Sequence, residues 1–314
     1  MTQKEQNYDL LILGGGPAGL TAALYGGRGL LSTAVIDTGV TGGQLTNILE
    51  IENYPGFPII SGFDLVEKIE EHADKFNISK HIMQEITKVD LVSPVKVIQT
   101  TETVFKAKTV VIATGAKLKK LGVPGENEFV GRGVSYCAVC DGAFFKDKEV
   151  CVIGGGNAAV EEAIYLTRFA SRVNIIHRRD ALRAEKVYQQ RAMNDPKINF
   201  IWDTVVTSIN GNGKVESVSL QNVKTGETTE KQTDAVFPYI GYEPNTELFA
   251  EQIRLDSKGF IITDENLATS CEGVFAAGDV RVSPLRQVVT SAADGAISAT
   301  SAVKYLEEKH FVQV

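Results

Sequence analysis

Two glycine-rich segments of the same form stand far apart in this 314-residue chain, GGGPAG at residues 14–19 and GGGNAA at 154–159. Each follows a short apolar run, at 9–13 or 150–153, and each opens a stretch with helical periodicity. A strand, a tight glycine turn and a helix form a dinucleotide-binding unit, in which N–H groups at the helix start hold a pyrophosphate. The sequence therefore predicts an α/β fold with two such units, the alternative for either segment being a structural turn.

The second strand of each unit ends in different side chains. In the first unit it ends in Asp37, whose carboxylate accepts hydrogen bonds from a ribose diol and repels a 2′-phosphate. In the second unit it ends in His177, Arg178 and Arg179, and Arg183 follows one helical turn later. Guanidinium groups pair with phosphate through two hydrogen bonds, so the second unit is predicted to prefer NADPH. A solvated surface turn is the alternative for these arginines.

The segment between the two units contains a pair of cysteines, Cys137 and Cys140. Four unevenly spaced cysteines do not form a disulfide framework, and no second CxxC or paired histidine completes a zinc site, so we expect no metal. The pair precedes Asp141 at a predicted helix start, which stabilises a thiolate beside a carboxylate that can transfer protons. These features predict reversible disulfide chemistry, whereas Cys151 and Cys271 are expected to have no chemical role.

Composition narrows the class of protein. A chain of this length holds about two domains, and its apolar fraction of 43% is ample for their cores. The net charge of −7 and the absence of a basic stripe argue against a nucleic-acid surface. The sequence contains neither a run of eighteen apolar residues nor an apolar core near its polar N-terminus. We therefore expect a cytoplasmic enzyme with small-molecule or protein partners and no membrane contact.

The apolar pattern predicts further elements along the chain. They are a helix with its stripe at Val66, Ile69, Ala73 and Phe76, a strand at 110–113, a hairpin formed by 215–220 and 229–237 around Gly226, a strand at 274–277 and a last helix at 287–306. Asp279 follows the strand at 274–277, and the carboxyl ends of strands are where α/β sheets bind ligands.

The order of the motifs GxGxxG, GGQL, ENYPG, ATGA, CAVCDG, GGGNAA, HRRD and AAGDV closely resembles the low-molecular-weight bacterial thioredoxin reductases over nearly the whole chain. The resemblance implies two Rossmann-like three-layer nucleotide-binding domains in a homodimer. The FAD domain would comprise residues 1–116 and 247–314, with an NADPH domain inserted at 117–246. It also implies hydride transfer from NADPH to FAD, reduction of the Cys137–Cys140 disulfide, and exchange with thioredoxin or a thioredoxin-like protein.

The resemblance also implies roles for individual residues, carried over by position. Cys140 would face the flavin, Cys137 would attack the thioredoxin disulfide and Asp141 would move the protons. FAD would contact Gly14, Gly16, Gly19, Gly43, Gln44, Asn53, Asp279, Arg286 and Gln287. NADPH would be held by Gly154, Gly156, His177, Arg178, Arg179 and Arg183. The candidate cofactor sites further include Pro17, Ala18, Asp37, Thr38, Gly42, Leu45, Ala113, Thr114, Gly115, Gly278, Val288, Asn157, Ala158, Ala159, Ile240 and Gly241.

One position departs from the family pattern, and two other functions remain open. The family usually has Asp-Ser or Asp-Thr where this chain has Asn157 and Ala158, so a hydroxyl near the bound nucleotide is missing. Because backbone N–H groups provide most of the pyrophosphate binding, we expect the dinucleotide to bind more weakly but still to be used. The flavoprotein of an alkyl hydroperoxide reductase system is one alternative, but it carries an additional amino-terminal dithiol domain, which we do not expect before a first strand preceded by eight residues. The other is a flavin-bound redox sensor that signals through the dithiol.

Overall fold

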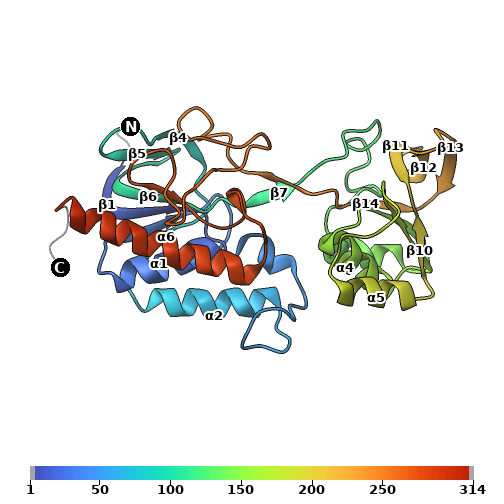
Figure 1. Cartoon of the computed structure of the whole chain (residues 1–314), viewed down its shortest axis with the longest axis horizontal. Coiled ribbons are helices and arrows are strands. Elements are labelled where there is room, and N and C mark those ends of the chain that lie inside the picture. Colours follow the sequence, from blue (N-terminus) through green and yellow to red (C-terminus); the bar gives the residue numbers. More distant parts are fainter. Residues whose placement is uncertain (1–3, 311–314) are drawn as a thin grey trace. The chain divides into compact units, whose positions relative to one another are not determined.

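The computed structural model describes residues 4–310, which form two compact units (Figure 1). The first unit comprises the chain up to Lys117 and again from Glu243 onward, and the second comprises Leu118–Tyr242. The second unit is therefore an insertion in the sequence of the first. Each unit contains one of the two glycine turns.

The first unit is built on a seven-stranded sheet with the order β3-β2-β1-β6-β5-β4, in which β16 also pairs with β6. Strands β3, β2, β1, β6 and β16 run parallel, whereas β4 and β5 are antiparallel to their neighbours. The strands are β1 (Lys4–Leu13), β2 (Thr33–Ile36), β3 (Ser79–His81), β4 (Ile86–Asp90), β5 (Lys96–Thr100), β6 (Thr103–Ile112) and β16 (Val274–Ala276). The helices are α1 (Pro17–Arg28), α2 (Gly62–Asp74) and α6 (Val288–Glu308), with the 3₁₀ helices η1 (Gly43–Asn47) and η3 (Gly278–Val280).

Helices α1 and α6 pack closely on one face of this sheet. Leu10 and Ile12 of β1 face these helices, and Leu11 and Leu13 contribute to the core on the opposite face, as expected for alternating strand positions. A Cβ atom on Gly295 of α6 would lie 2.2 Å from the carbonyl oxygen of α1 residue 18, so only glycine permits this approach. The small residues that the sequence shows in its last helix therefore bring two helix backbones together.

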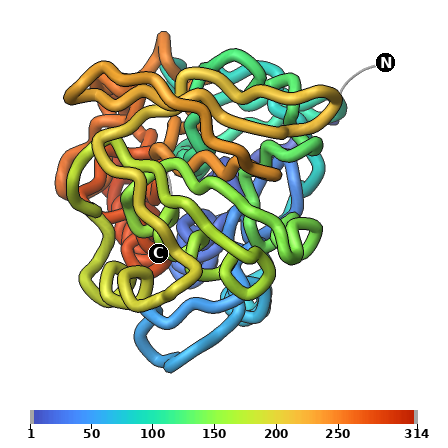
Figure 2. The backbone as a smooth tube through the Cα atoms, turned by 90° about the vertical axis from the view of Figure 1, so that its right-hand side faces the viewer, coloured from blue at the N-terminus to red at the C-terminus, as the bar shows by residue number. Residues whose placement is uncertain are grey.

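The second unit has three layers. A parallel sheet, with the order β10-β9-β8-β14, lies between helices and an antiparallel sheet of order β11-β12-β13, whose strands run side by side in Figure 2. The strands are β8 (Glu149–Ile153), β9 (Arg172–Ile176), β10 (Ile198–Ile201), β11 (Thr204–Gly211), β12 (Val215–Asn222), β13 (Thr228–Gln232) and β14 (Ala235–Pro238). The helices are α3 (Ala138–Asp141), η2 (Gly142–Phe145), α4 (Asn157–Leu166) and α5 (Lys186–Asn194).

Two short strands, β7 (Ala116–Leu118) and β15 (Tyr242–Pro244), carry the chain out of the first unit and back, and they pair with each other. Beside them, Thr114 Oγ1 donates to the carbonyl oxygen of Asn245 at 2.8 Å. The Asn245 side-chain amide donates in return to the carbonyl oxygen of Thr114, also at 2.8 Å. The two connections are therefore joined side by side. No helix among residues 4–310 is long and apolar enough to cross a membrane.

The structure corrects three details of the sequence-based prediction. Residues 229–237 do not form one hairpin strand: β13 pairs with β12, and after Thr233 the chain enters β14, which pairs with β8 in the other sheet. Strand β13 is exposed over most of its length and β14 is buried throughout, but the sequence pattern does not show that the two strands pair in different sheets. Strand β1 begins at Lys4, earlier than its apolar run, and Phe76 lies beyond the end of α2 at Asp74.

Candidate redox and nucleotide-binding sites

The two cysteines of the CAVC segment lie at the start of the short helix α3. Cys137 and Cys140 form a disulfide, and Cys137 is the residue immediately before the helix. The backbone N–H of Cys140 points at Cys137 Sγ at 3.1 Å, so it can stabilise negative charge on that sulfur when the pair is reduced. Within its unit Cys140 is exposed and Cys137 is half-buried, and Asp141 closes the same helix.

Two side chains that the sequence did not indicate accept hydrogen bonds from the backbone of this segment. The Tyr239 hydroxyl, at the end of β14, accepts a hydrogen bond from the Ala138 N–H at 3.1 Å. Burial of this phenol raises its pKa, so it stays neutral. Ser135 Oγ accepts from the Cys137 N–H at 3.1 Å. The backbone on both sides of the Cys137 Cα is therefore fixed by hydroxyl groups.

A buried carboxylate anchors the residue that precedes the dithiol. Glu126, with 1% of its surface exposed, accepts hydrogen bonds from the N–H groups of Leu121 and Gly122 at 2.8 and 2.7 Å. It also accepts one from the Tyr136 hydroxyl at 2.8 Å. Burial, followed by the Glu126 charge, raises the pKa of Tyr136. The chain that enters the second unit is thus tied directly to the dithiol segment.

The first glycine turn leaves room for a phosphate. Gly14 has φ +109°, and a Cβ there would lie 2.3 Å from the Ala113 carbonyl oxygen. A Cβ on Gly19 would lie 1.8 Å from the Gly14 carbonyl oxygen, so this position also requires glycine. By contrast, a Cβ on Gly16, which caps the N-terminus of α1, would meet nothing within 4 Å. Its N–H end therefore borders open space of the kind a pyrophosphate fills.

Asp37 lies at the end of β2 and faces the first glycine turn. Its Oδ2 accepts from the Gly15 N–H, and its Oδ1 accepts from the Gly39 N–H at 2.7 Å. The carboxylate is thus oriented by backbone donors at the edge of the turn. This is the position at which a ribose diol is bound in a unit of this type.

The returning part of the chain adds polar groups to the first unit. Burial raises the pKa of Asp279, and the Arg286 charge opposes this shift. The Arg286 guanidinium lies 4.1 Å from the centre of the Phe260 ring, and its Nε is buried without a hydrogen-bond partner among the described residues. Gln287 precedes α6 and accepts, through Oε1, a hydrogen bond from Asn53 at 3.2 Å.

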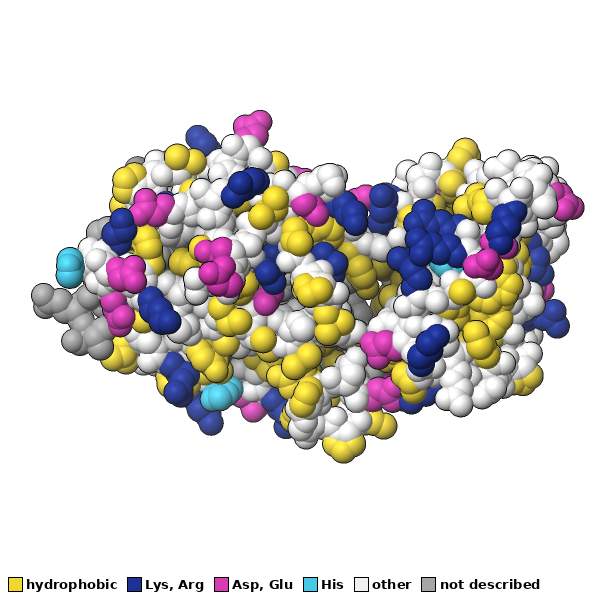
Figure 3. Space-filling view, viewed as in Figure 1, with side chains coloured by type: hydrophobic (Ala, Val, Ile, Leu, Met, Phe, Trp, Pro, Cys, Tyr) yellow, Lys and Arg dark blue, Asp and Glu magenta, His cyan; other side chains and the backbone are white. Residues whose placement is uncertain are grey.

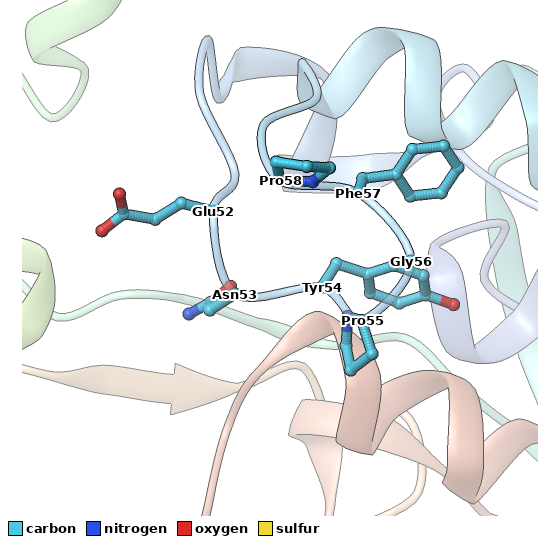
Figure 4. A pocket seen from close by; sticks show the side chains of 7 residues that line it. All are labelled: Glu52, Asn53, Tyr54, Pro55, Gly56, Phe57 and Pro58. Carbon is cyan, nitrogen blue, oxygen red and sulfur yellow. The ribbon is translucent and has the colours of Figure 1, made fainter.

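Asn53 belongs to a loop that lines an open pocket by itself. The pocket is bordered by residues 52–58, whose side chains are drawn in Figure 4. Tyr54 and Phe57 of this loop stack with their ring centres 6.4 Å apart. The contact from Asn53 to Gln287 ties the loop to the start of α6, so residues distant in the sequence meet at one edge of the first unit.

The second glycine turn repeats the backbone of the first with other side chains. Gly154 has φ +147°, and a Cβ there would lie 2.3 Å from the Tyr239 carbonyl oxygen. A Cβ on Gly156, the cap of α4, would again meet nothing within 4 Å. His177 takes the place of Asp37, and its ring packs so closely on Gly155 that a Cβ there would lie 2.6 Å from ring atoms. Its Nε2 is buried without a partner among the described residues.

Three arginines surround this histidine on the outside. Burial lowers the pKa of His177, and the charges of Arg183, Arg179 and Arg178 lower it further, so the ring is neutral at pH 7. All three arginines are exposed, and none forms an ion pair with another part of residues 4–310. Figure 3 shows basic side chains gathered over this unit, with a histidine beside them. Unpaired guanidinium groups around a glycine turn suit a phosphate monoester.

Family comparison agrees with this arrangement. The pyridine nucleotide-disulphide oxidoreductase family matches residues 8–296. The chain belongs to this family. It is 50% identical over 310 residues to the thioredoxin reductase of Peptoclostridium acidaminophilum, with 96% of this chain and 98% of the relative covered. It is 49% identical over 306 residues to the thioredoxin reductase of Bacillus subtilis, covering 97% and 96% of the two chains.

A solved structure supports the fold of this oxidoreductase. Thioredoxin reductase of Lactococcus lactis is 47% identical and superimposes with a TM-score of 0.93, covering 96% of this chain and 99% of that one. The α/β fold and the family resemblance predicted from the sequence are therefore confirmed. The dithiol of this family member is present as a disulfide, as the sequence led us to expect.

The groups left without partners test whether this oxidoreductase can hold two dinucleotides. Arg286 Nε in the first unit and His177 Nε2 in the second are buried donors or acceptors with no partner in the described chain. Buried polar groups are normally hydrogen-bonded, so each of these two nitrogens is available to a ligand. The open space beside Gly16 and Gly156 lies at the corresponding helix ends. These residues fit a bound dinucleotide in each unit.

The remaining candidate residues lie close to these turns in sequence and structure. Pro17 and Ala18 open α1, and Ala158 and Ala159 lie in the first turn of α4. The residues in the loops and strand ends around the first turn are Thr38, Gly42, Gly43, Gln44, Leu45, Ala113, Thr114, Gly115, Gly278 and Val288. Ile240 and Gly241 follow Tyr239 at the end of β14. Asn157 begins α4, but both ends of its side-chain amide are already bonded to Glu185.

Proposed function

We propose that this chain is an NADPH-dependent thioredoxin-disulfide reductase that carries FAD. The observation that carries the proposal is the Cys137–Cys140 disulfide in the same unit as a glycine turn bordered by unpaired arginines. Relatives that are about half identical over nearly the whole chain are named thioredoxin reductases. Thioredoxin or a thioredoxin-like protein is the proposed partner.

Each cofactor is assigned to one unit. FAD would lie against the Gly14 turn, with Asp37 on its ribose and with Asp279, Arg286 and Gln287 contributed by the returning chain. NADPH would lie against the Gly154 turn, with the 2′-phosphate held by Arg178, Arg179 and Arg183. The proposal includes the domain boundaries at 116/117 and 246/247, the homodimer and the cytoplasmic location expected from the sequence.

Bound FAD would supply a two-electron carrier between the nicotinamide and the disulfide. After reduction, the Cys137 thiolate attacks one sulfur of the thioredoxin disulfide, and the displaced sulfur leaves as a thiolate. Cys140 then attacks Cys137 Sγ, which releases the second thioredoxin sulfur and restores the Cys137–Cys140 disulfide. Asp141 transfers protons between these sulfurs and water. The N–H of Cys140, aimed at Cys137 Sγ, supports Cys137 as the nucleophile.

The dithiol and the NADPH site belong to one unit, yet both must reach one flavin in the other. We therefore include in the proposal a rigid-body rotation of residues 117–246 about the connections near 115–119 and 241–246. A disulfide engineered to lock the two units in either orientation is expected to block turnover and to leave one half-reaction intact. Normal turnover by the locked enzyme would contradict the rotation.

Turnover with NADPH and oxidised thioredoxin tests the central assignment. The enzyme is expected to turn over many times and to be yellow, with about one FAD per chain. Cys137→Ser is expected to abolish thioredoxin reduction without preventing flavin reduction by NADPH, whereas Cys151→Ala, which removes a buried thiol outside α3, is expected to retain turnover. Colourless protein refutes the flavin assignment. A reaction that stops after one equivalent supports a redox sensor instead.

A further inference from the structure

The segment that carries Arg183 is fastened to the second glycine turn by two hydrogen bonds between Asn157 and Glu185. Asn157 Nδ2 donates to Glu185 Oε1 at 2.7 Å, and the Glu185 N–H donates to Asn157 Oδ1 at 2.8 Å. The two residues lie 28 positions apart, one at the start of α4 and the other just before α5. We name this pair the amide clasp.

The backbone of the same segment binds the turn directly. The N–H groups of Arg183 and Ala184 both donate to the Gly155 carbonyl oxygen, at 2.7 and 3.1 Å. Leu182 and Ala184 are buried on either side of Arg183, which is itself exposed. The clasp follows at the next residue, so the chain around Arg183 is held from residue 182 to residue 185. The fold therefore fixes the direction of the Cα–Cβ bond of Arg183.

We propose that Asn157 and Glu185 are positioning residues that set the affinity of the second unit for a nucleotide with a 2′-phosphate. This inference rests on the proposed NADPH site. An arginine on a fixed backbone loses less freedom when it binds phosphate than one on a loose loop, so the clasp increases affinity. The clasp also engages the Glu185 carboxylate in a hydrogen bond with the Asn157 amide. Without the Asn157 amide, that carboxylate is free, two residues from Arg183, to compete with phosphate for the guanidinium.

Exchanging the two functional groups isolates the clasp. Asn157→Asp places two carboxylates against each other, so the donor is lost and the pair repels. Glu185→Gln keeps an oxygen that accepts from Asn157. In the double variant Asn157→Asp/Glu185→Gln, the Gln amide donates to the Asp carboxylate and the clasp forms again with its polarity reversed. Asn194→Asp makes the same chemical change at the exposed end of α5 and serves as the matched control.

The probe is 2′,5′-ADP, which carries the 2′-phosphate but no nicotinamide. It is titrated into the flavin-loaded enzyme by calorimetry. The control ligand is 5′-AMP, which lacks the 2′-phosphate. Asn157→Asp is expected to lower the affinity for 2′,5′-ADP about tenfold and to raise the KM for NADPH by a similar factor, with a much smaller change in kcat. The double variant is expected to recover affinity to within about threefold of the unmodified enzyme. Glu185→Ala, a substitution at an exposed position, is expected to weaken binding of 2′,5′-ADP about fivefold. This variant tests the clasp if Asn157→Asp fails to fold.

The outcomes separate this inference from the function on which it rests. If the unmodified enzyme does not bind 2′,5′-ADP more tightly than 5′-AMP, the NADPH site itself is wrong. If it does, and Asn157→Asp and Glu185→Ala bind like the Asn194→Asp control, the clasp has no role in affinity. Equal weakening of Asn157→Asp and the double variant also overturns the inference, because it assigns the effect to a negative charge at the start of α4.

Discussion

The two glycine turns have the same backbone and different surroundings. Both begin with a glycine at positive φ that lies against a carbonyl oxygen of the neighbouring strand end, and both end in a helix cap that borders open space. They differ at the last glycine position of the GxGxxG motif, where the first turn has Gly19 and the second has Ala159. They differ again after the second strand, where Asp37 corresponds to His177.

Under the proposed function, these differences separate the part of each unit that binds phosphate from the part that selects the ligand. The shared backbone provides N–H groups, which can donate hydrogen bonds to the oxygens of any pyrophosphate. The side chain at the end of the second strand decides between a free ribose and a phosphorylated one, because a carboxylate repels a 2′-phosphate and arginines bind it. The helices differ as well: Ala22 of α1 is fully buried, and the corresponding position in α4 is Glu162.

The largest expected effect is that of Gly19→Ala. Its Cβ would lie 1.8 Å from the Gly14 carbonyl oxygen, a backbone atom that cannot move without opening the turn. Overpacking of this kind costs about 3 kcal/mol or more, so we expect loss of bound flavin and a large fall in Tm, measured by absorbance and by thermal unfolding. In the second unit, Ala159→Gly should cost only about 1 kcal/mol. Similar stability of the two variants would show that the turns are equivalent.

Removal of the arginines tests the selection of ligand. Arg178→Ala with Arg179→Ala removes charge-assisted hydrogen bonds worth about 1.5–3 kcal/mol each, so kcat/KM with NADPH should fall at least about 100-fold. The value with NADH should change little, because NADH lacks the 2′-phosphate. Steady-state kinetics with both nucleotides gives the comparison. Equal efficiency of the unmodified enzyme with NADPH and NADH contradicts the assignment.

Glu162 sharpens the comparison of the two helices. One oxygen of its carboxylate is buried without a partner in the described chain, and burial raises its pKa from 4.5 to about 7. The folded state therefore favours the protonated form, and stability is lost as the pH rises from 4.5 through 7. Glu162→Gln is expected to stabilise the protein at pH 8 by up to about 3 kcal/mol and to change little near pH 4.5. Denaturant unfolding at both pH values measures this, and an equal change at both would assign the effect to packing.

The smallest expected effect concerns His177. Its pKa lies below the ordinary value, so the unfolded chain binds a proton more readily and the folded protein loses stability as the pH falls below about 6.5. His177→Gln should flatten the dependence of unfolding free energy on pH between 7 and 5. An unchanged slope in His177→Gln would assign this pH dependence to other groups.

The sequence predicted the parts of the molecule that depend on local pattern. Residues 14–19 and 154–159 both follow a strand and open a helix, and Cys137 immediately precedes α3. Local pattern could not reveal partners that only the tertiary fold brings together. The Tyr239 hydroxyl reaches Ala138 across 101 positions, and Glu185 reaches Asn157 across 28. The prediction of a single strand over residues 229–237 failed for the same reason, because the tertiary fold determines which strands pair.

The insertion of one unit into the sequence of the other determines the order in which they can be completed on the ribosome. Residues 118–242 are contiguous, so the second unit has all of its strands as soon as it emerges. The first unit still lacks β16, which pairs with β6, and α6, which packs on α1 through Gly295. Because domains generally fold as units during synthesis, the nascent chain exposes the apolar face of α1 while the inserted unit is already folded. The segment translated first is therefore the last to acquire its complete core, and the nascent chain is most vulnerable to aggregation during that interval.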